Sequence, residues 1–344
     1  MSLLSVTDLH VGYRQAAGLL PALRGVSFAL DSGESLGLVG ESGCGKTTLA
    51  RALLRLLPGN GVVSGGQVTF RDRALLDLPI DEFRKIRWRE IAVVTQSAMN
   101  ALDPVVRVGH QIVEAIRKHE RCTQAAAFER AGSLFAAVGL EAAWLSRYPH
   151  EFRGGMRQRA IIAMALALDP VLIIADEPTT ALDVVMQDQV YEHIARIRRD
   201  RRRALILITH DLALVGENCD RIAVMYAGRI VETAASEAIL NAPLHPYTIG
   251  LRNAFPDFDG DARELISIPG APPGPGEAAT GCAFAPRCPF AAERCRSEAP
   301  VARAIEPGHE VACHFAEDAP RLRMLGALEA TWERGAAGLA AAPA

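Results

Sequence analysis

The residues best suited to chemistry lie near the N-terminus, in the run GESGCGKT at 40–47. Its spacing is that of the loop G-x-x-x-x-G-K-[ST], which wraps around phosphate groups. Gly40 and Gly45 let the backbone turn its amides toward the β- and γ-phosphates at a helix N-terminus, where anions are stabilised. The Lys46 ammonium would neutralise phosphate charge, and the Thr47 hydroxyl would bind Mg²⁺. The alternative is a glycine-rich turn before an ordinary helix, but with only three lysines in the chain the match is specific.

Two apolar runs end in further reactive groups. VLIIADE at 171–177 ends in two carboxylates, and ALILITH at 204–210 ends in a histidine. Behind a phosphate-binding loop, Asp176 would belong to the Mg²⁺ shell and Glu177 would polarise the attacking water. The second run would deliver His210 to the edge where the phosphates lie. Each signal alone is more often a solvated loop or a structural histidine, but together they predict hydrolysis of a nucleoside triphosphate.

Strands and helices alternate over residues 1 to about 235 and must position these groups. Continuous Val, Ile and Leu runs are typical of strands covered on both faces, which indicates an α/β domain. Segments 26–30 and 67–71 lie beside Gly-rich turns and are expected to form antiparallel hairpins. Residues 97–165 have a helical pattern without a convincing strand. The main strands are expected at 3–9, 34–40, 91–96, 171–177, 204–210 and 221–228.

Local patterns predict two further features. A helix should follow the phosphate-binding loop, with Leu49, Leu53 and Leu56 on one face and Pro58-Gly59 as its stop. Residues 269–289 read PGAPPGPGEAATGCAFAPRCP, which is too rich in Pro and Gly for regular structure.

Composition excludes several classes of protein. The 37 Lys and Arg nearly balance the 40 Asp and Glu, so a strongly basic nucleic-acid binder is not expected. A hydrophobic content of 49% suffices for one large core and a smaller unit, and it excludes a disordered chain. The longest apolar run, 160–168, is far short of the roughly 20 residues that a bilayer needs. The first residues, MSLLSVTDLHVGY, carry no export signal.

These motifs resemble those of the ATP-binding cassette (ABC) family, and the resemblance covers essentially the whole chain. It implies that Gln96 is the Q-loop residue, which touches Mg²⁺ and senses a transmembrane partner. Asp183, in ALD at 181–183, would be the D-loop residue, and His210 the switch histidine. Tyr13 would stack on adenine, although an early aromatic residue usually only packs. The implied nucleotide contacts are Tyr13, Gly40, Glu41, Ser42, Gly43, Cys44, Gly45, Lys46, Thr47, Thr48 and Gln96.

The resemblance also implies a fold and its division. The fold class is α/β: a P-loop NTPase domain of ABC type with a RecA-like core, an antiparallel β subdomain and a helical subdomain at about 97–165. A small C-terminal domain rich in Pro, Gly and Cys would follow. The expected division is a cassette at 1–240, an extension at 241–320, and a C-terminal helix and tail at 321–344. The cofactors implied are ATP and Mg²⁺, the metal held by Thr47, Gln96 and Asp176.

One segment departs from the family pattern. YPHEFRGGMRQRA at 148–160 resembles the signature segment, which completes the ATP site of the opposite subunit. The pattern L-S-G-G-Q reads here Phe152-Arg153-Gly154-Gly155-Met156, so a long cation replaces the usual serine. A homodimer would carry Arg153 in both ATP sites, which favours a heterodimer with a paralogous ATPase. The alternative is that Arg153 points to solvent and the amides of Gly154 and Gly155 suffice.

The second half of the chain narrows the resemblance. The marks are SAMNALDPVVRVG at 97–109, HPYT at 245–248, ISIPGAPP at 266–273 and FAPRCP at 284–289. They resemble ATPases of oligopeptide and dipeptide importers. The implied partners are two transmembrane permease subunits, a paralogous ATPase and an extracytoplasmic substrate-binding protein, without nucleic acid. The implied location is the cytoplasmic face of the bacterial inner membrane, as a peripheral protein.

Four of the seven cysteines crowd together, at Cys282, Cys288, Cys295 and Cys313. In a chain without an export signal, this crowding favours metal ligation over disulfides. The spacing C-x5-C-x6-C-x17-C lacks the short C-x2-4-C chelate of structural zinc and fits a [4Fe–4S] cluster better. The resemblance agrees, since this extension can hold such a cluster. Zinc and metal-free thiols are the alternatives.

Three functions compete on these observations. The first is the ATPase subunit of a bacterial ABC importer for peptides or related solutes. The second is a soluble ABC ATPase acting on nucleic acid or ribosomes, which usually has two cassettes or long insertions. The third is a regulatory subunit whose iron–sulfur domain senses while its ATPase is vestigial, which the intact Asp176, Glu177 and His210 argue against.

Overall fold

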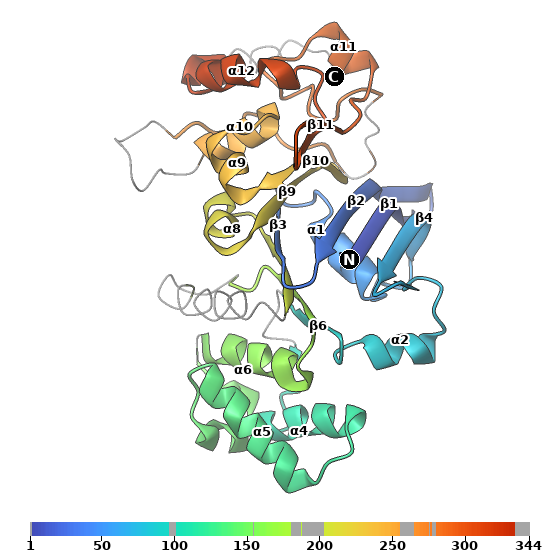
Figure 1. Cartoon of the computed structure of the whole chain (residues 1–344), viewed down its shortest axis with the longest axis vertical. Coiled ribbons are helices and arrows are strands. Elements are labelled where there is room, and N and C mark those ends of the chain that lie inside the picture. Colours follow the sequence, from blue (N-terminus) through green and yellow to red (C-terminus); the bar gives the residue numbers. More distant parts are fainter. Residues whose placement is uncertain are drawn as a thin grey trace. The chain divides into compact units, whose positions relative to one another are not determined.

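The computed structural model describes residues 2–95, 101–153, 155–179, 187, 203–254, 265–274, 276 and 280–333 (Figure 1). The chain folds into two compact units. Unit 1 consists of Met1–Leu4, Ala29–Ser35 and Thr69–Ile208. Unit 2 consists of Ser5–Phe28, Leu36–Val68 and Thr209–Ala344.

Unit 2 contains a ladder of strands in the order β11-β12-β10-β9-β3. β3 and β9 are parallel, whereas β9, β10, β12 and β11 are joined by antiparallel pairings. The strands predicted at 34–40 and 221–228 are confirmed, and β3 is buried along its whole length, as its apolar sequence requires. The bounds are β3 (Ser35–Val39), β9 (Arg221–Tyr226), β10 (Arg229–Ala235), β11 (Arg303–Glu306) and β12 (His309–Val311).

The strands at the edge of this ladder were not predicted. β10 begins directly after a turn at Ala227 and Gly228, whose φ angles are 48° and 80°. β11 and β12 are joined by Pro307 and Gly308, and Gly308 has a left-handed φ of 76°. A Pro-Gly pair is a turn signal that can be recognised in the sequence. The partner of β12 is β10, far away in the sequence, so local pattern does not identify the pairing.

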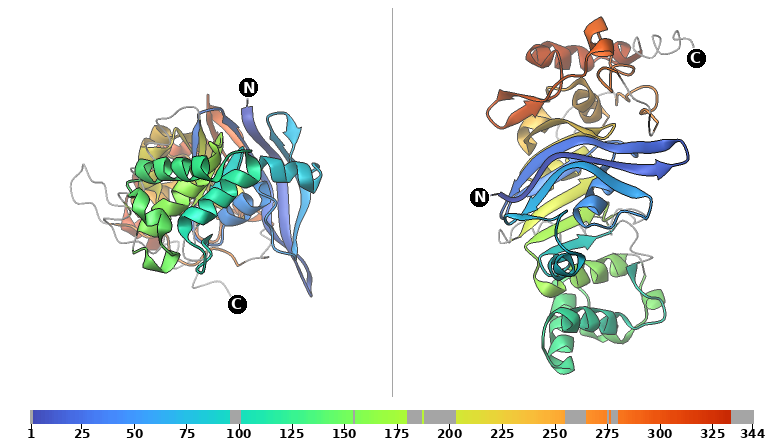
Figure 2. Two further views of the ribbon diagram at one scale, coloured as in Figure 1. Left: turned by 90° about the horizontal axis from the view of Figure 1, so that it is seen from below. Right: turned by 90° about the vertical axis from the view of Figure 1, so that its right-hand side faces the viewer.

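A second sheet has the order β2-β1-β4-β5, and its long strands are seen side by side in Figure 2. The segments predicted at 3–9, 26–30 and 67–71 are parts of β1, β2 and β4, all longer than expected. Gly18, with φ of 122°, makes the turn between β1 and β2. The bounds are β1 (Ser2–Gln15), β2 (Gly18–Asp31), β4 (Gly61–Phe70) and β5 (Arg73–Ala74).

Helix α1 (Lys46–Leu53) follows the phosphate-binding loop but is shorter than predicted. Leu49 and Leu53 are buried as expected, whereas Leu56 is 45% exposed, so its predicted place on the buried face is wrong. The helix ends because Arg55 adopts a left-handed φ of 51°. The Leu56 amide then donates to the Arg51 carbonyl (2.8 Å), which closes the last turn.

Unit 1 contains the parallel strands β8-β7-β6. They confirm the strands predicted at 204–210, 171–177 and 91–96, apart from the ends. β7 and β8 are fully buried, as expected of continuous apolar runs. The bounds are β6 (Ile91–Val94), β7 (Leu172–Asp176) and β8 (Ala204–Thr209).

The helical pattern predicted over 97–165 is confirmed for 101–153 and 155–165, where the structure describes helices and turns but no strand. An aromatic cluster holds the helices together, since Phe152 packs edge-on against Trp144 and Phe135 with ring centroids 5.3 and 6.4 Å apart. The helices of unit 1 are α2 (Ile80–Ile86), α4 (Val108–His119), α5 (Gln124–Ala137), η1 (Ala142–Ser146), η2 (Pro149–Glu151), α6 (Gly155–Ala165) and η3 (Leu166–Leu168).

The remaining helices of unit 2 are short, and an irregular stretch lies between α10 and α11 in the sequence. In the described part of 269–289 there is no helix or strand, in agreement with the Pro and Gly content. Among the described residues, no helix is long and apolar enough to cross a membrane. The helices are α8 (Leu212–Asn218), α9 (Ser236–Asn241), α10 (Pro246–Asn253), α11 (Glu293–Ser297), η4 (Ala316–Asp318) and α12 (Ala319–Gly326).

The buried carboxylate of Glu232, on β10, connects this strand to the start of α10 and to β12. The Glu232 side chain is fully buried and accepts hydrogen bonds from the Leu244 amide (2.6 Å) and the His245 amide (3.0 Å). Its Oε1 also lies 2.7 Å from the His309 Nε2 of β12. Because a buried charge is tolerated only when donors surround it, these contacts fix the entry to α10 and the position of β12 together.

His245 caps α10 and should make the stability of this segment depend on pH. Its Nδ1 accepts from the Tyr247 amide (3.0 Å), which requires that nitrogen to be unprotonated. Burial lowers the pKa of His245 from 6.5 to about 4, although the nearby Glu232 opposes this. Between pH 6.5 and 4, His245 is therefore protonated in the unfolded chain but neutral in the folded one. As the pH falls through this window, the free energy of unfolding decreases by up to about 1.4 kcal/mol per pH unit.

Urea unfolding between pH 7.5 and 5, followed by fluorescence in a protein that keeps Trp332 but has Trp88 and Trp144 replaced by Phe, measures this dependence. Trp332 is buried and its indole donates to the Gly326 carbonyl (2.8 Å), so it reports on the C-terminal segment. The control is His245→Asn, which can still cap α10 but does not titrate. We expect a flatter pH profile for this variant, and equal slopes for both proteins would contradict the role of His245.

Candidate functional site

The loop at 40–47 connects β3 to α1 and depends on glycine at two positions. Gly40 has φ of 153°, and a Cβ there would lie 2.2 Å from the Met225 carbonyl oxygen. Gly45, the residue before α1, has φ of 111°, and its Cβ would lie 2.8 Å from Leu23. Left-handed backbone and close neighbours both exclude other residues here. The two glycines of the motif therefore shape the loop as the sequence predicted.

Lys46 is buried within this loop. Its Nζ donates to the Gly40 carbonyl (2.6 Å) and the Glu41 carbonyl (3.1 Å), and it lies 3.7 Å from the Cys44 Sγ. Burial raises the pKa of the Cys44 thiol, although Lys46 acts against this. Ser42 and Gly43 are exposed at the tip of the loop. The Lys46 side chain is thus held inside the loop by two backbone carbonyls, where the motif is expected to bind phosphate.

The two threonines that follow begin α1, and Thr47 and Thr48 are partly buried. The Tyr13 hydroxyl lies 2.9 Å from the Thr48 Oγ1, so this aromatic residue of β1 is held beside the start of the helix. The Tyr13 ring is half-buried. The hydrogen bond to Thr48 is a contact that the sequence did not predict, and stacking of the Tyr13 ring on adenine stays a prediction.

Unit 1 carries the acidic strand end. Asp176 is the last residue of β7 and is 6% exposed. Glu177 follows with a left-handed φ of 44°, and its amide donates to the Ile208 carbonyl (2.8 Å) at the end of β8. A positive φ at a residue other than Gly is strained and is common at functional sites. In unit 2, His210 is exposed directly after Thr209, and Asp211 caps α8 through the Leu214 amide (3.1 Å).

The signature segment is described in part. Arg153 is exposed, Gly155 is buried as the first residue of α6, and the Met156 amide donates to the Arg153 carbonyl (3.1 Å). Three predicted site residues, Gln96, Gly154 and Asp183, lie outside the described residues.

The four clustered cysteines line a single pocket in unit 2, together with residues that include His245, Phe284, Phe290 and His314. All four thiols are unoxidised, and the free space between them is about 20 Å³. The four cysteines thus line one pocket, and their ligation of a metal stays a prediction. Within the described part of the chain, no group of three or more His, Cys, Asp or Glu side chains could hold a metal ion as it stands.

Burial controls the chemistry of these thiols. It raises the pKa of Cys313 to about 12, and it raises the pKa values of Cys288 and Cys282 as well. Repulsion between the thiolates adds to the effect at all three. Without a bound metal, Cys282, Cys288 and Cys313 are therefore neutral thiols at neutral pH, and any metal that they bind must displace their protons.

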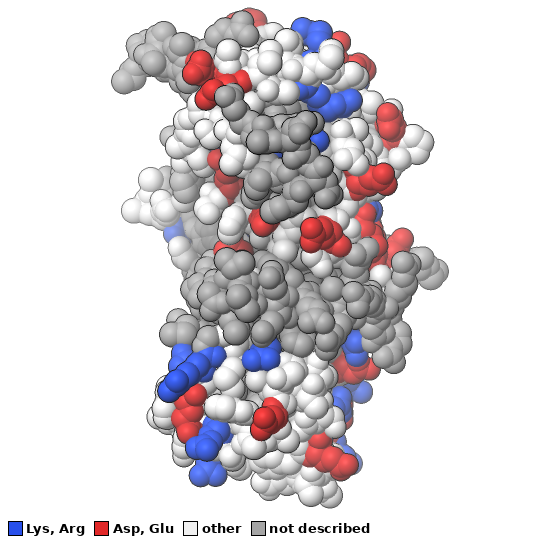
Figure 3. Space-filling view, turned by 90° about the vertical axis from the view of Figure 1, so that its left-hand side faces the viewer, with Lys and Arg blue, Asp and Glu red and all other residues white. Residues whose placement is uncertain are grey.

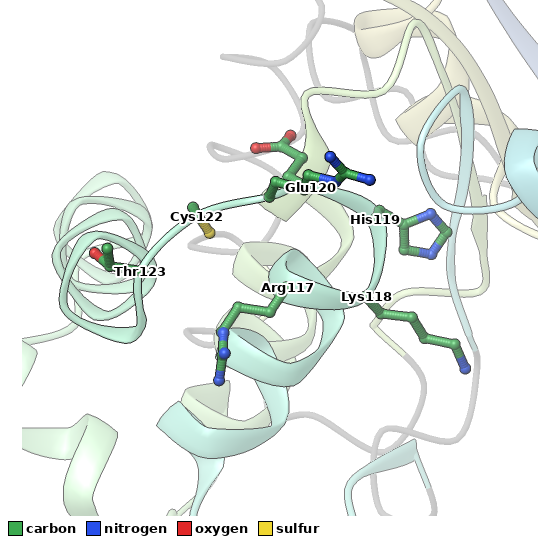
Figure 4. Close-up of a pocket in the computed structure, with 7 residues that line it drawn as sticks. Arg117, Lys118, His119, Glu120, Cys122 and Thr123 are labelled. Carbon is green, nitrogen blue, oxygen red and sulfur yellow. The ribbon is translucent and has the colours of Figure 1, made fainter.

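A hollow at Arg117–Thr123, between α4 and α5, was not predicted. In Figure 4 the long side chains of Arg117, Lys118 and Glu120 point away from one another. Because the basic groups do not converge, this hollow has no arrangement that would select a ligand. On the face drawn in Figure 3, acidic side chains lie among the basic ones, which matches the near balance of charge.

Two family models match the chain. The model for ABC transporters matches residues 23–180, and that for the C-terminal region of oligopeptide/dipeptide transporters matches residues 231–295. The first match contains the phosphate-binding loop and the acidic end of β7. The second contains HPYT and three of the four clustered cysteines.

Known relatives match over nearly the whole chain. A probable peptide ABC transporter ATP-binding protein of Sinorhizobium fredii is 47% identical, over 90% of this chain and 94% of its own. The oligopeptide transport ATP-binding protein OppD of Escherichia coli is 44% identical, over 91% of this chain and 93% of its own. The dipeptide transport ATP-binding protein DppD of Escherichia coli is 41% identical, over 92% of this chain and 98% of its own.

A solved structure matches the fold. The dimeric ATP-binding cassette MJ0796, bound to ADP and Pi, has a TM-score of 0.62 and covers 68% of this chain and 98% of its own, at 24% identity. The match confirms the predicted fold class, an α/β nucleotide-binding domain of the P-loop type.

Proposed function

The chain belongs to the family of ABC transporter ATP-binding proteins, and we propose that it hydrolyses ATP to power the import of peptides. The observation that carries the proposal is the match of residues 231–295 to the C-terminal region of oligopeptide/dipeptide transporters. The phosphate-binding loop, with Lys46 held inside its backbone ring, supplies the site for ATP. ATP and Mg²⁺ are the cofactors of this family.

The other two functions are not favoured. A soluble ABC ATPase acting on nucleic acid or ribosomes does not fit relatives that are named as peptide transport proteins and that match over about nine-tenths of this chain. A regulatory subunit with a vestigial ATPase is not favoured either, because the residues expected to hydrolyse ATP are present.

The partners follow from the importer function. We propose that the chain binds two transmembrane permease subunits at the cytoplasmic face of the inner membrane, in a system with an extracytoplasmic substrate-binding protein. The division into a cassette at 1–240, an extension at 241–320 and a helix and tail at 321–344 belongs to the same proposal.

We assign the chemical steps to residues as follows. When ATP binds, the Lys46 ammonium exchanges the Gly40 and Glu41 carbonyls for phosphate oxygens. Thr47, Gln96 and Asp176 would hold the Mg²⁺, which neutralises phosphate charge. Glu177 would orient the attacking water, and His210 would lie near the γ-phosphate.

We further propose that Cys282, Cys288, Cys295 and Cys313 hold a [4Fe–4S] cluster. Four thiols that face one enclosed pocket are the donor set that such a cluster requires. A cluster of four irons is wider than one ion, so its ligands stand farther apart than those of zinc. Because the free space is small, side chains that line the pocket must move to admit the cluster. His309 and His314 are not needed, since both have hydrogen-bond partners in the protein.

We propose a heterodimer with a paralogous ATPase, because Arg153 stands where the signature pattern has serine. Cassettes of this family pair head to tail, so each ATP lies between one subunit's phosphate-binding loop and the other's signature. If the partner is a paralogue with an intact signature, that signature would pair with this chain's phosphate-binding loop in one ATP site. The other ATP site would contain Arg153. The site with Arg153 would bind ATP but hydrolyse it slowly, with the guanidinium paired to a phosphate oxygen.

Replacing Glu177 by Gln tests the hydrolytic role. Because Gln cannot accept the proton of the attacking water, turnover should fall about 10²–10⁴-fold while ATP still binds. Steady-state phosphate release by the assembled transporter, together with ATP binding, measures both. Glu114→Gln, at an exposed carboxylate of α4, is the matched control. Near-normal turnover by Glu177→Gln would remove this residue from catalysis.

Anaerobic purification tests the cysteine pocket. We expect a brown protein with broad visible absorption and about four irons per chain. Cys288→Ser should lose the iron and disorder the extension while the cassette stays folded, because metal binding and local folding are coupled. Cys122→Ser, outside the pocket, should keep its iron. A colourless protein with one zinc per chain would decide against the cluster.

Asymmetric mutation tests the heterodimer. In the reconstituted transporter, Glu177→Gln in this chain should abolish transport, because this chain's carboxylate serves the site with the intact signature. The matching change in the partner should cost much less. Equal losses from the two variants would contradict the asymmetric arrangement.

A further inference from the structure

A residue of the cysteine-rich segment contacts the phosphate-binding loop directly. Arg287 lies in the turn between Cys282 and Cys288, and it forms a two-pronged ion pair with Glu41, the second residue of the loop. Its Nη1 donates to the Glu41 Oε2 (2.6 Å) and its Nη2 to the Glu41 Oε1 (2.9 Å). The Arg287 side chain is 3% exposed and that of Glu41 is 29% exposed. Such paired hydrogen bonds are strong and directional.

The rest of the guanidinium is also held. The Arg287 Nε donates to the Pro269 carbonyl (3.0 Å), and its Nη2 also reaches the Ile268 carbonyl (3.4 Å). Its Nη1 donates to the Tyr226 hydroxyl (3.4 Å). The planar group therefore has one orientation, set by the Pro-rich stretch and by the end of β9. A lysine could not make all of these contacts.

A residue of α10 holds the backbone of Glu41. The Glu41 amide donates to the Tyr247 hydroxyl (2.9 Å), and the Tyr247 ring is completely buried. That ring packs against Tyr226 and Phe284, with centroids 4.7 and 5.3 Å away. The Glu41 carbonyl meanwhile accepts from Lys46. All three polar groups of Glu41 are thus engaged: the carboxylate by Arg287, the amide by Tyr247 and the carbonyl by Lys46.

We propose that Arg287 is a positioning residue for the ATP site, which with Tyr247 holds the phosphate-binding loop in the geometry that receives nucleotide. The proposal rests on the assignment of 40–47 as the ATP loop. Its electrostatic part is specific. Arg287 neutralises Glu41, and without it a bare carboxylate would stand at the mouth of a loop that must bind a triphosphate. Loss of Arg287 should therefore weaken nucleotide binding by repulsion as well as by disorder.

Calorimetric titration of the full chain with Mg·ADP tests this, since ADP avoids hydrolysis. Arg287→Met should raise the Kd at least about tenfold, which is about 1.4 kcal/mol. Arg287→Lys should be intermediate. Arg294→Met is the matched control, because it breaks the exposed Arg294–Glu298 pair in the same segment and should leave the Kd unchanged.

A second substitution separates positioning from general damage. Glu41→Gln removes the carboxylate charge, so adding it to Arg287→Met should bring the Kd back to within about threefold of the native value. Mere unfolding of the segment would not be rescued in this way. In the assembled transporter, Arg287→Met should raise the KM for ATP while kcat at saturating ATP changes little.

Two outcomes would overturn the proposal: an unchanged Kd for Arg287→Met, or no rescue by Glu41→Gln. If Arg287→Met does not fold, Tyr247→Phe takes its place, because it removes only the acceptor of the Glu41 amide and should weaken ADP binding about three- to tenfold. Lys46→Ala shows whether the loop binds nucleotide at all. Normal ADP binding by that variant would refute the loop assignment, whereas a strong loss there with no effect at Arg287 would refute only the positioning role.

Discussion

The C-terminal half of the structure depends on one buried carboxylate. Glu232 is completely buried on β10, and a charge in that position must be surrounded by donors. Those donors are two amides at the entry to α10 and the ring of His309 on β12. Satisfying this single group therefore places α10, and α10 carries Tyr247. The Tyr247 ring lies against Tyr226 and Phe284, so the following turn brings Arg287 to Glu41.

Much of the fold could be predicted from the sequence, because the information was local. Apolar runs of Val, Ile and Leu identified β3, β6, β7, β8 and β9, and the glycines of the loop were identified by spacing. The predictions failed at two places, one with a distant cause and one with a local cause. β12 is a short strand whose partner is β10, and nothing near it distinguishes it from a loop. Leu56 fits the apolar spacing of α1, yet the left-handed Arg55 ends that helix first.

The candidate site divides in the same way. The residues proposed to touch phosphate or water belong to motifs with fixed spacing, so the sequence could single them out and family membership could support them. Arg287 was overlooked, although FAPRCP at 284–289 was noted for its resemblance to ATPases of peptide importers. Its partner Glu41 is 246 positions away, and only the folded chain shows that the two side chains meet. The signal available was an arginine between two metal-ligand candidates, which by itself is no more than a solvated charge.

The closeness of Arg287 to the cysteines has a thermodynamic consequence. Arg287 directly precedes Cys288, so the backbone that places one side chain also places the other. A ligand that orders the cysteine pocket and moves this turn would change the free energy of the Glu41 contact, and linkage would then require nucleotide at the loop to change the affinity of the pocket by the same factor. The size of this coupling depends on whether the turn is already rigid. The several hydrogen bonds of the Arg287 guanidinium indicate that the turn is already rigid. The cysteine pocket is therefore expected to support the phosphate-binding loop permanently and not to switch it between two conformations.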